Sequence, residues 1–409
     1  MSGAGALIRQ LRLERNFSQA GLARGICAAS YLSKIEQGQA EASPEILERL
    51  FLALGVRYCT DSRLLARAEA VLETYFAARE RGEPTADQEQ WLDANLDAVT
   101  YSSLSLWVGL YKAARAPQPE QARIQLEALW ELRNQMTPAQ QYRFWVLRAF
   151  ASGSAEQTLE DLQQAERQKP CAWVRYEIAL AACHMGRYSQ SIEAAERAYQ
   201  MAAEEGDLYV LIWASFLLGS CYTNRDMNFA EKYYRRAVRL GGKANPGLED
   251  MVAYNLGASY LEWGQPEKAQ AWLTRTRPVE GNDDHNLLLY QKLAILHAQA
   301  GEPEQAAAAL DRAEAILSSF SGADWQRSLY GDMLEFARQL LCDATDVPAY
   351  EALLLRLCAD AGEKLGFGFR RFYGQYLIAL YRSQRRYKDA LRVVEELNRE
   401  GTAAQTDLS

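Results

Sequence analysis

The chain has 409 residues, of which 49% are hydrophobic, and a formal net charge of −8. This is enough apolar material for one small and one large domain. Charged residues from Arg9 onward interrupt the first segment, and no run of about 18 apolar residues occurs, so we expect a cytoplasmic protein that does not cross a membrane. The seven cysteines are scattered and show no Cys-x-x-Cys spacing, which predicts neither a disulfide framework nor a zinc site.

Charge is unevenly distributed along the chain. The first 36 residues contain five basic residues against Glu14 and Glu36, a net charge of +3, whereas the part after residue 60 is acidic. A basic segment on an acidic body is typical of a DNA-binding module joined to a domain with another role. The five basic residues are Arg9, Arg12, Arg15, Arg24 and Lys34.

The hydrophobic pattern predicts an all-α protein. Apolar residues recur at three- and four-residue spacing, prolines number 11, and no segment shows sustained period-two alternation. Glycine and proline recur at short intervals, so we expect helices of roughly 10 to 18 residues joined by tight turns.

Residues 7–56 predict five short helices. Ser18 is suited to cap the second of them, which begins at Gln19. The third begins at Ala29 and is ended by Gly38. Two short helices, a tight turn and apolar anchors at these offsets predict a helix-turn-helix.

This segment resembles the Xre and lambda-repressor-like family in its SYLSKIE-x-G string and its closing LGV. More narrowly, GICAASYLSKIEQGQ is similar to the helix-turn-helix of the RRNPP group of peptide-pheromone receptors, the PlcR, NprR and Rgg kind. The resemblance implies a quorum-sensing transcription regulator that binds double-stranded DNA and a short linear peptide. Because one short helix contacts few base pairs, we expect a homodimer on a palindromic operator, with the dimer interface in the rest of the chain.

In such a module the third helix enters the major groove, and the start of the second binds phosphate. The alternatives to DNA contact are that Tyr31 is half-buried in the core and that the arginines form a solvated helix face. The residues assigned to DNA binding are Gln19 at a phosphate, Ala29, Ser30, Tyr31, Ser33 and Lys34 at the groove or its rim, and Arg9, Arg12 and Arg15 as backbone contacts.

From residue 171 onward the predicted helices form self-similar pairs. Residues 217–237, 255–276 and 292–313 align, and Gly264 recurs as Gly301, 37 residues on. These segments resemble the tetratricopeptide repeat, which has a glycine at the helix contact, an aromatic residue three positions later, a turn glycine and a small residue in the second helix. That resemblance implies a right-handed superhelix of helical hairpins.

Weaker copies of the pattern occupy 171–201 and 372–398, and we interpret 62–170 and 318–368 as degenerate repeats. The expected domains are 1–60, the helix-turn-helix; 61–170, degenerate helical repeats; 171–401, a repeat domain for ligand binding and dimerisation; and 402–409, a flexible tail.

Stacked hairpins leave the first helix of each pair along a concave groove that suits an extended peptide. Asn255 is the strongest candidate, because asparagine in this register is typical of contacts to a ligand's peptide group in related repeats. A hydrogen bond to a neighbouring helix is the alternative for Asn255, as a partly core position is for the aromatic residues. The predicted peptide-binding residues are Tyr176, His184, Trp213, Phe216, Asn224, Tyr254, Asn255, Glu262, Gln291, Lys292 and Gln299.

No motif in the sequence indicates catalysis, a metal or a cofactor. His184, His285 and His297 lack metal-ligand spacing, and no Gly-rich phosphate loop or nucleophile elbow occurs. We therefore expect a protein that is not an enzyme and that needs no cofactor. The alternative function is a repeat scaffold that sequesters or regulates a partner protein, of the response-regulator or anti-repressor type, with DNA binding that is independent of peptide.

Overall fold

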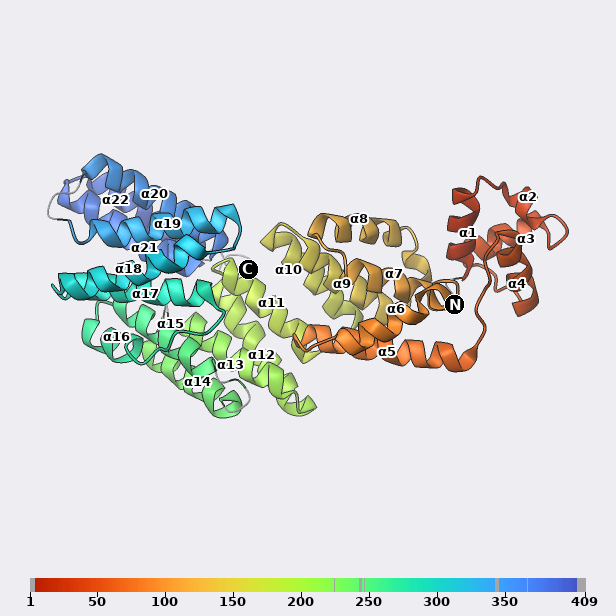
Figure 1. Cartoon of the computed structure of the whole chain (residues 1–409), viewed down its shortest axis with the longest axis horizontal. Coiled ribbons are helices and arrows are strands. Elements are labelled where there is room, and N and C mark those ends of the chain that lie inside the picture. Colours follow the sequence, from red (N-terminus) through yellow and green to blue (C-terminus); the bar gives the residue numbers. More distant parts are fainter. Residues whose placement is uncertain are drawn as a thin grey trace. The chain divides into compact units, whose positions relative to one another are not determined.

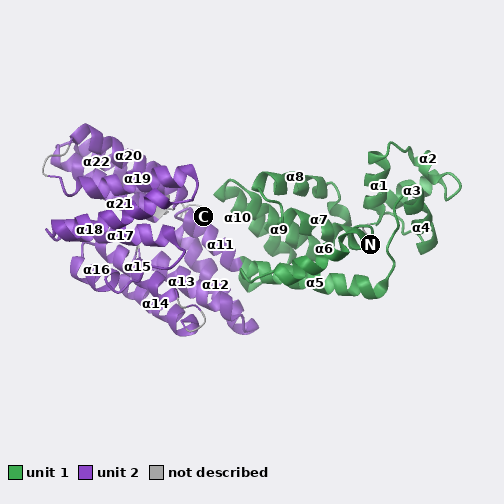
Figure 2. Ribbon diagram, in the orientation of Figure 1, with its two compact units in different colours: residues 1–174 green, residues 175–409 purple. Residues whose placement is uncertain are grey.

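The chain forms two compact units, Met1–Val174 and Arg175–Ser409 (Figure 2). Every regular element in the part of the chain that the structure describes is a helix, which confirms the all-α prediction (Figure 1). None of these helices is long and apolar enough to cross a membrane. The structure, a computed structural model, describes residues 4–223, 225–242, 245, 247–342, 346–365 and 367–402.

Unit 1 begins with four helices around a small core that includes Ile8, Leu32 and Phe51. A fifth helix was predicted before residue 56 but does not form. Instead the chain turns at Gly55, with φ of 69°, and continues without regular structure to Asp61, which caps the next helix. The four helices are α1 (Ala4–Glu14), α2 (Gln19–Ala23), α3 (Ala29–Glu36) and α4 (Pro44–Ala53).

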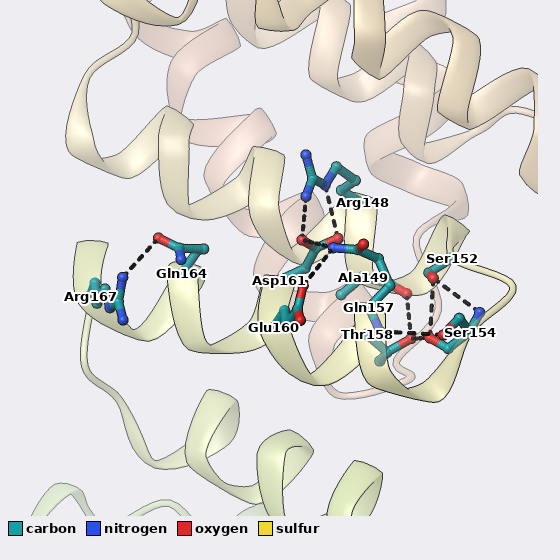
Figure 3. Close-up of polar contacts among 10 residues, drawn as sticks. All are labelled: Arg148, Ala149, Ser152, Ser154, Gln157, Thr158, Glu160, Asp161, Gln164 and Arg167. Carbon is teal, nitrogen blue, oxygen red and sulfur yellow. Dashed lines mark hydrogen bonds and ion pairs between the residues drawn. The ribbon is translucent and has the colours of Figure 1, made fainter.

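Antiparallel helices complete unit 1, and α9 and α10 illustrate how they pair. Arg148 on α9 donates to both carboxylate oxygens of the buried Asp161 on α10, at 2.6 and 2.9 Å, and Gln157 adds a third donor at 3.0 Å (Figure 3). The helices are α5 (Ser62–Glu80), α6 (Ala86–Thr100), α7 (Ser105–Ala114), α8 (Pro119–Trp130), α9 (Pro138–Ala151) and α10 (Ala155–Gln168), with a short 3-10 helix at Arg133–Gln135.

Unit 2 consists of successive helical hairpins, and the three aligned segments form α13 with α14, α15 with α16, and α17 with α18 (Figure 1). The helices, the first of which begins in unit 1, are α11 (Ala172–His184), α12 (Tyr188–Glu205), α13 (Leu208–Tyr222), α14 (Met227–Gly241), α15 (Leu248–Glu262), α16 (Pro266–Leu273), α17 (Asp283–Gln299), α18 (Pro303–Ser319), α19 (Asp324–Gln339), α20 (Val347–Lys364), α21 (Phe367–Ser383) and α22 (Tyr387–Thr402). Most of the predicted tail, 403–409, lies outside the described residues.

Glycine permits the close approach of the two helices in a hairpin. A Cβ at Gly257 of α15 would lie 2.6 Å from Cγ of Leu273 on α16, so any side chain there would separate the pair. Gly264 and Gly301 close their turns with φ of 65° and 72°, the left-handed region that favours glycine. The repeat pattern therefore predicted both kinds of glycine, the one at the helix contact (Gly257) and the ones in the turns (Gly264 and Gly301).

The repeat tyrosines differ from one another in their packing. The Tyr260 hydroxyl donates to Glu231 on α14 at 2.8 Å and so joins neighbouring hairpins. Tyr222 instead stacks on Phe229 and Tyr233 of its own hairpin, with ring centroids 5.4 and 5.3 Å apart.

Candidate DNA-binding and peptide-binding sites

Local sequence signals position the helix-turn-helix. The Ser18 hydroxyl accepts a hydrogen bond from the Gly21 amide at 2.9 Å and caps α2, as predicted. Gly25, with φ of 74°, makes the turn that leads to α3, and Gly38, with φ of 71°, follows the end of α3. The start of α3 carries no side-chain cap, since its N-cap residue is Ala28.

The surface of α3 presents part of the predicted DNA-binding set. Ala29, Ser30 and Lys34 are exposed, as contact with a duplex requires. Tyr31 is half-buried, and its hydroxyl donates to the Glu41 carbonyl at 2.8 Å. Ser33 is also half-buried, and its hydroxyl accepts from the Gln37 amide at 3.3 Å.

Arg12 does not belong to that surface, which corrects its predicted role as a DNA-backbone contact. Its guanidinium is buried against Glu36 of α3, with Nε–Oε1 of 2.6 Å and Nη2–Oε2 of 2.9 Å. Its third donor, Nη1, binds the Phe17 carbonyl at 2.9 Å. The hydrogen bond to Glu36 raises the pKa of Arg12. Arg12 therefore joins α1 to α3 within the domain.

Gln19 takes part in the same network. Its side-chain amide donates to Glu36 Oε2 at 2.8 Å, so this amide is already bound within the domain. Arg9 is exposed and lines a cavity of about 650 Å³ between α1 and helices α6–α8. Arg15 is exposed near Gly55, where an added Cβ would be 2.8 Å from Arg15 Nη1.

The sequence contained a signal for the Arg12–Glu36 pair that the prediction did not use. Arg12 lies four residues after the buried Ile8, and Glu36 lies four residues after the buried Leu32. Both charged residues are thus on the inward face of their helices. Two opposite charges at inward positions of neighbouring helices indicate a buried ion pair.

Unit 2 contains a groove of about 460 Å³ lined by the first helices of successive hairpins, α11, α13, α15 and α17. The hairpin pattern predicted that the first helices would line a groove. The predicted residues that line it are Tyr176, His184, Trp213, Phe216, Tyr254, Asn255, Glu262 and Lys292.

Two predicted residues lie elsewhere, and one is outside the described residues. The Gln291 amide is buried and donates to the Tyr373 hydroxyl at 3.4 Å, while the Gln299 amide donates to the Tyr376 hydroxyl at 2.8 Å. Both amides therefore join α17 to α21, which corrects their predicted place in the groove. Asn224 falls outside the described residues.

The second helices and the C-terminal helices also line this groove. Tyr188 and Tyr234 come from α12 and α14, and Phe369 and Phe372 come from α21. None of these four residues was predicted to line the groove. The aromatic-rich string FGFRRFYGQY, residues 367–376, was a signal for the α21 wall, but repeat register gives no information about which distant helix closes a groove.

Asn255 lies among polar groups within this aromatic lining. The Tyr234 hydroxyl is hydrogen-bonded to Ser220 at 2.9 Å, and burial raises the pKa of Tyr234 while hydrogen bonds with Ser220 and Asn255 oppose the rise. Burial lowers the pKa of His184, so the neutral imidazole is favoured. The groove thus offers amide and hydroxyl groups between aromatic faces.

Three charged residues of unit 2 interact with one another: Glu262 on α15, Lys292 on α17 and Arg371 on α21. Burial raises the pKa of Glu262, and the positive charges of Arg371 and Lys292 oppose that rise. Arg371 Nε lies 3.5 Å from Glu262 Oε1. Burial lowers the pKa of Lys292 to about 7. In the described part of the chain, no cluster of His, Cys, Asp and Glu could hold a metal ion.

Comparison with known families supports the division into two kinds of module. A helix-turn-helix family model matches residues 8–59, and a tetratricopeptide repeat model matches residues 170–243. Residues 8–59 are therefore a helix-turn-helix domain, and residues 170–243 belong to the tetratricopeptide repeats. No curated protein matches the sequence.

The fold is that of the Rap and NprR proteins, which confirms the predicted RRNPP resemblance at the level of domains and fold. A Rap protein complexed with Competence and Sporulation Factor has a TM-score of 0.63 and 13% identity, over 83% of this chain and 98% of that chain. The apo quorum sensor NprR from B. thuringiensis has a TM-score of 0.61 and 16% identity, over 82% and 99%. NprR with its cognate peptide NprX has a TM-score of 0.60 and 15% identity, over 81% and 98%.

Proposed function

We propose that this protein is a quorum-sensing transcription regulator whose α3 surface binds DNA and whose unit 2 groove binds a short signalling peptide. The observation that carries the proposal is the groove itself, which brings Asn255 together with aromatic residues of six helices in a chain that also carries a helix-turn-helix. NprR in complex with its cognate peptide NprX has the same fold at low identity.

The chemistry of the groove matches an extended peptide. Trp213 and Phe216 meet edge to face with centroids 5.7 Å apart and offer an apolar wall for side chains. Asn255 can both donate to and accept from one backbone peptide group. An apolar pocket with a few directional polar groups is typical of ligand sites.

On the DNA side, the proposal keeps Ala29, Ser30 and Lys34 as the contact surface, with Tyr31 and Ser33 at its rim. Peptide binding would modulate DNA binding or the oligomeric state of a homodimer, held through the repeat domain and bound to a palindromic operator in the cytoplasm. The proposal assigns the chain no catalytic step.

The decisive experiment is fluorescence anisotropy of a labelled fragment of DNA from upstream of the gene, with the full-length protein and fractionated culture supernatant as the probe. We expect a salt-sensitive complex. A supernatant fraction should change the affinity of wild type but not of Asn255→Ala. Asn228→Ala, an exposed asparagine at the start of α14, is the matched control and should respond as wild type does.

The remaining outcomes separate the two parts of the proposal. DNA binding that no supernatant fraction alters would contradict the peptide part. It would favour the alternative, a scaffold for a partner protein whose DNA binding is independent of peptide. An absence of DNA binding would contradict the DNA part of the proposal.

A further inference from the structure

Lys292 is a cation enclosed by rings. It projects from α17 with only 3% of its surface exposed, and it lines the groove. Its Nζ lies 3.3 Å from the ring centroid of Phe372 and 5.7 and 5.8 Å from those of Phe369 and Tyr373. Among the described residues, its ammonium has no hydrogen-bond or ion-pair partner.

The nearby acid does not neutralise this ammonium. Glu262 raises the pKa of Lys292 through its charge, but burial outweighs that effect. Glu262 is also the partner of Arg371, at 3.5 Å. When Lys292 is protonated and Glu262 is ionised, the three residues therefore carry a net charge of +1, because Glu262 and Arg371 cancel each other.

Aromatic faces satisfy a cation only in part. Ring quadrupoles attract an ammonium, but they replace few of the hydrogen bonds that its three N–H groups make in water. A buried cation without a counter-ion is therefore costly, and an anion that enters the same space lowers that cost. Since Lys292 lines an open groove, such an anion can come from an occupant of the groove.

Resting on the proposed function, we infer that the peptide bound in this groove presents a carboxylate that binds the Lys292 ammonium, beside the rings of Phe369 and Phe372. The carboxylate is either the C-terminus of the peptide or the side chain of an aspartate or glutamate. Lys292 thereby becomes the residue that selects anionic over neutral ligands.

Three pools of synthetic random heptapeptides test this inference on the full-length protein. The first has free C-termini and no Asp or Glu, the second has amidated C-termini and contains Asp and Glu, and the third is amidated and contains neither. Equilibrium dialysis followed by mass spectrometry measures the bound fraction of each pool. One charge-assisted hydrogen bond corresponds to a preference of about 10- to 100-fold over the third pool.

Retention of the first pool identifies a C-terminal carboxylate, and retention of the second identifies an acidic side chain. Lys292→Met, of similar length but neutral, should bind all pools as weakly as wild type binds the third. Lys268→Met is the control, because Lys268 is exposed on α16, outside the groove, and lies 5.0 Å from the Tyr260 ring centroid. The preference among the three pools is measured on wild type alone, so this test does not depend on whether a variant folds.

Equal binding of the three pools by wild type, or an unchanged preference in Lys292→Met, would overturn the inference and leave peptide binding intact. If no pool binds, the peptide part of the proposed function fails, and the inference fails with it.

Discussion

Arg12 and Glu36 join the first and third helices of the helix-turn-helix through two buried hydrogen bonds of 2.6 and 2.9 Å. The pair therefore holds α3 against α1 within the four-helix domain. Removal of one partner leaves the other charge buried and unpaired, which costs far more than the pair contributes relative to an apolar replacement.

We expect Glu36→Ala to destabilise the four-helix domain by about 3–5 kcal/mol. Amide hydrogen exchange in α3 of the full-length chain measures this as faster exchange of the core amides. Glu48→Ala, at an exposed position of α4, is the control and should leave exchange unchanged. The double variant Arg12→Met/Glu36→Leu removes both charges and should recover most of the loss. Equal exchange in Glu36→Ala and Glu48→Ala would refute the structural role of the pair.

Lys34 should contribute a phosphate contact that does not depend on base sequence. We expect Lys34→Ala to weaken binding to operator and non-operator DNA alike, and to reduce the slope of log K against log salt by about 1. Anisotropy titrations at several salt concentrations measure both effects. Lys388→Ala, exposed on α22, serves as the charge-matched control. A salt slope identical to that of wild type would show that Lys34 contacts no phosphate.

Gly257 should resist substitution, although it lies inside a helix. In Gly257→Ala the new Cβ would lie 2.6 Å from Leu273 Cγ and 3.0 Å from the Leu273 backbone nitrogen, so we expect a loss of about 1–3 kcal/mol from overpacking. Gly331, inside α19, has no atom within 4 Å of the corresponding Cβ position. Gly331→Ala should therefore stabilise the chain by about 0.5–1 kcal/mol. Thermal unfolding compares the two, and a shift of the same sign in both would contradict the packing argument.

Lys292 should make the stability of unit 2 depend on pH. Its pKa is about 7 in the folded chain, below the ordinary value of 10.5, because burial disfavours the charged form. Between these values the unfolded chain binds more protons than the folded one, so the contribution of Lys292 to the unfolding free energy rises with pH. Below about pH 7 both states are protonated, and the full cost of burial is present.

Wild type should therefore gain roughly 2 kcal/mol relative to Lys292→Met between pH 7 and pH 9. Urea unfolding of the two proteins at both pH values gives this difference, in which the shared effects of cysteines and tyrosines cancel. A difference that stays constant with pH would show that Lys292 does not titrate in this range.

Much of the fold was predictable because it depends on local periodicity. The helix-turn-helix, its Ser18 cap and the paired helices from residue 171 all arise from interactions within about one repeat. The 37-residue recurrence of Gly264 as Gly301 predicted the two turns, because both glycines have the positive φ that the turns require.

The parts that were not predicted depend on distant contacts. Which helix closes the groove is decided by packing between α17 and α21, where Gln291 and Gln299 bind Tyr373 and Tyr376. Repeat register placed both glutamines on the groove because it treats every hairpin as identical. It gives no information about a distant helix, such as α21, that packs across several hairpins. Arg12 was assigned to phosphate because a basic residue near a recognition helix has the same sequence signature whether or not an inward-facing glutamate neutralises it.

The groove takes its walls from helices far apart in the chain, with Tyr176 on α11 and Phe372 on α21. Hairpins in a repeat array pack mainly on their neighbours, so each end of the array can open without the other. An occupant that contacts both residues adds its binding free energy to the cost of opening either end. Ligand binding would thus convert unit 2 from a set of hairpins that fray separately into one cooperative folding unit, and amide exchange in α11 and α21 would slow together.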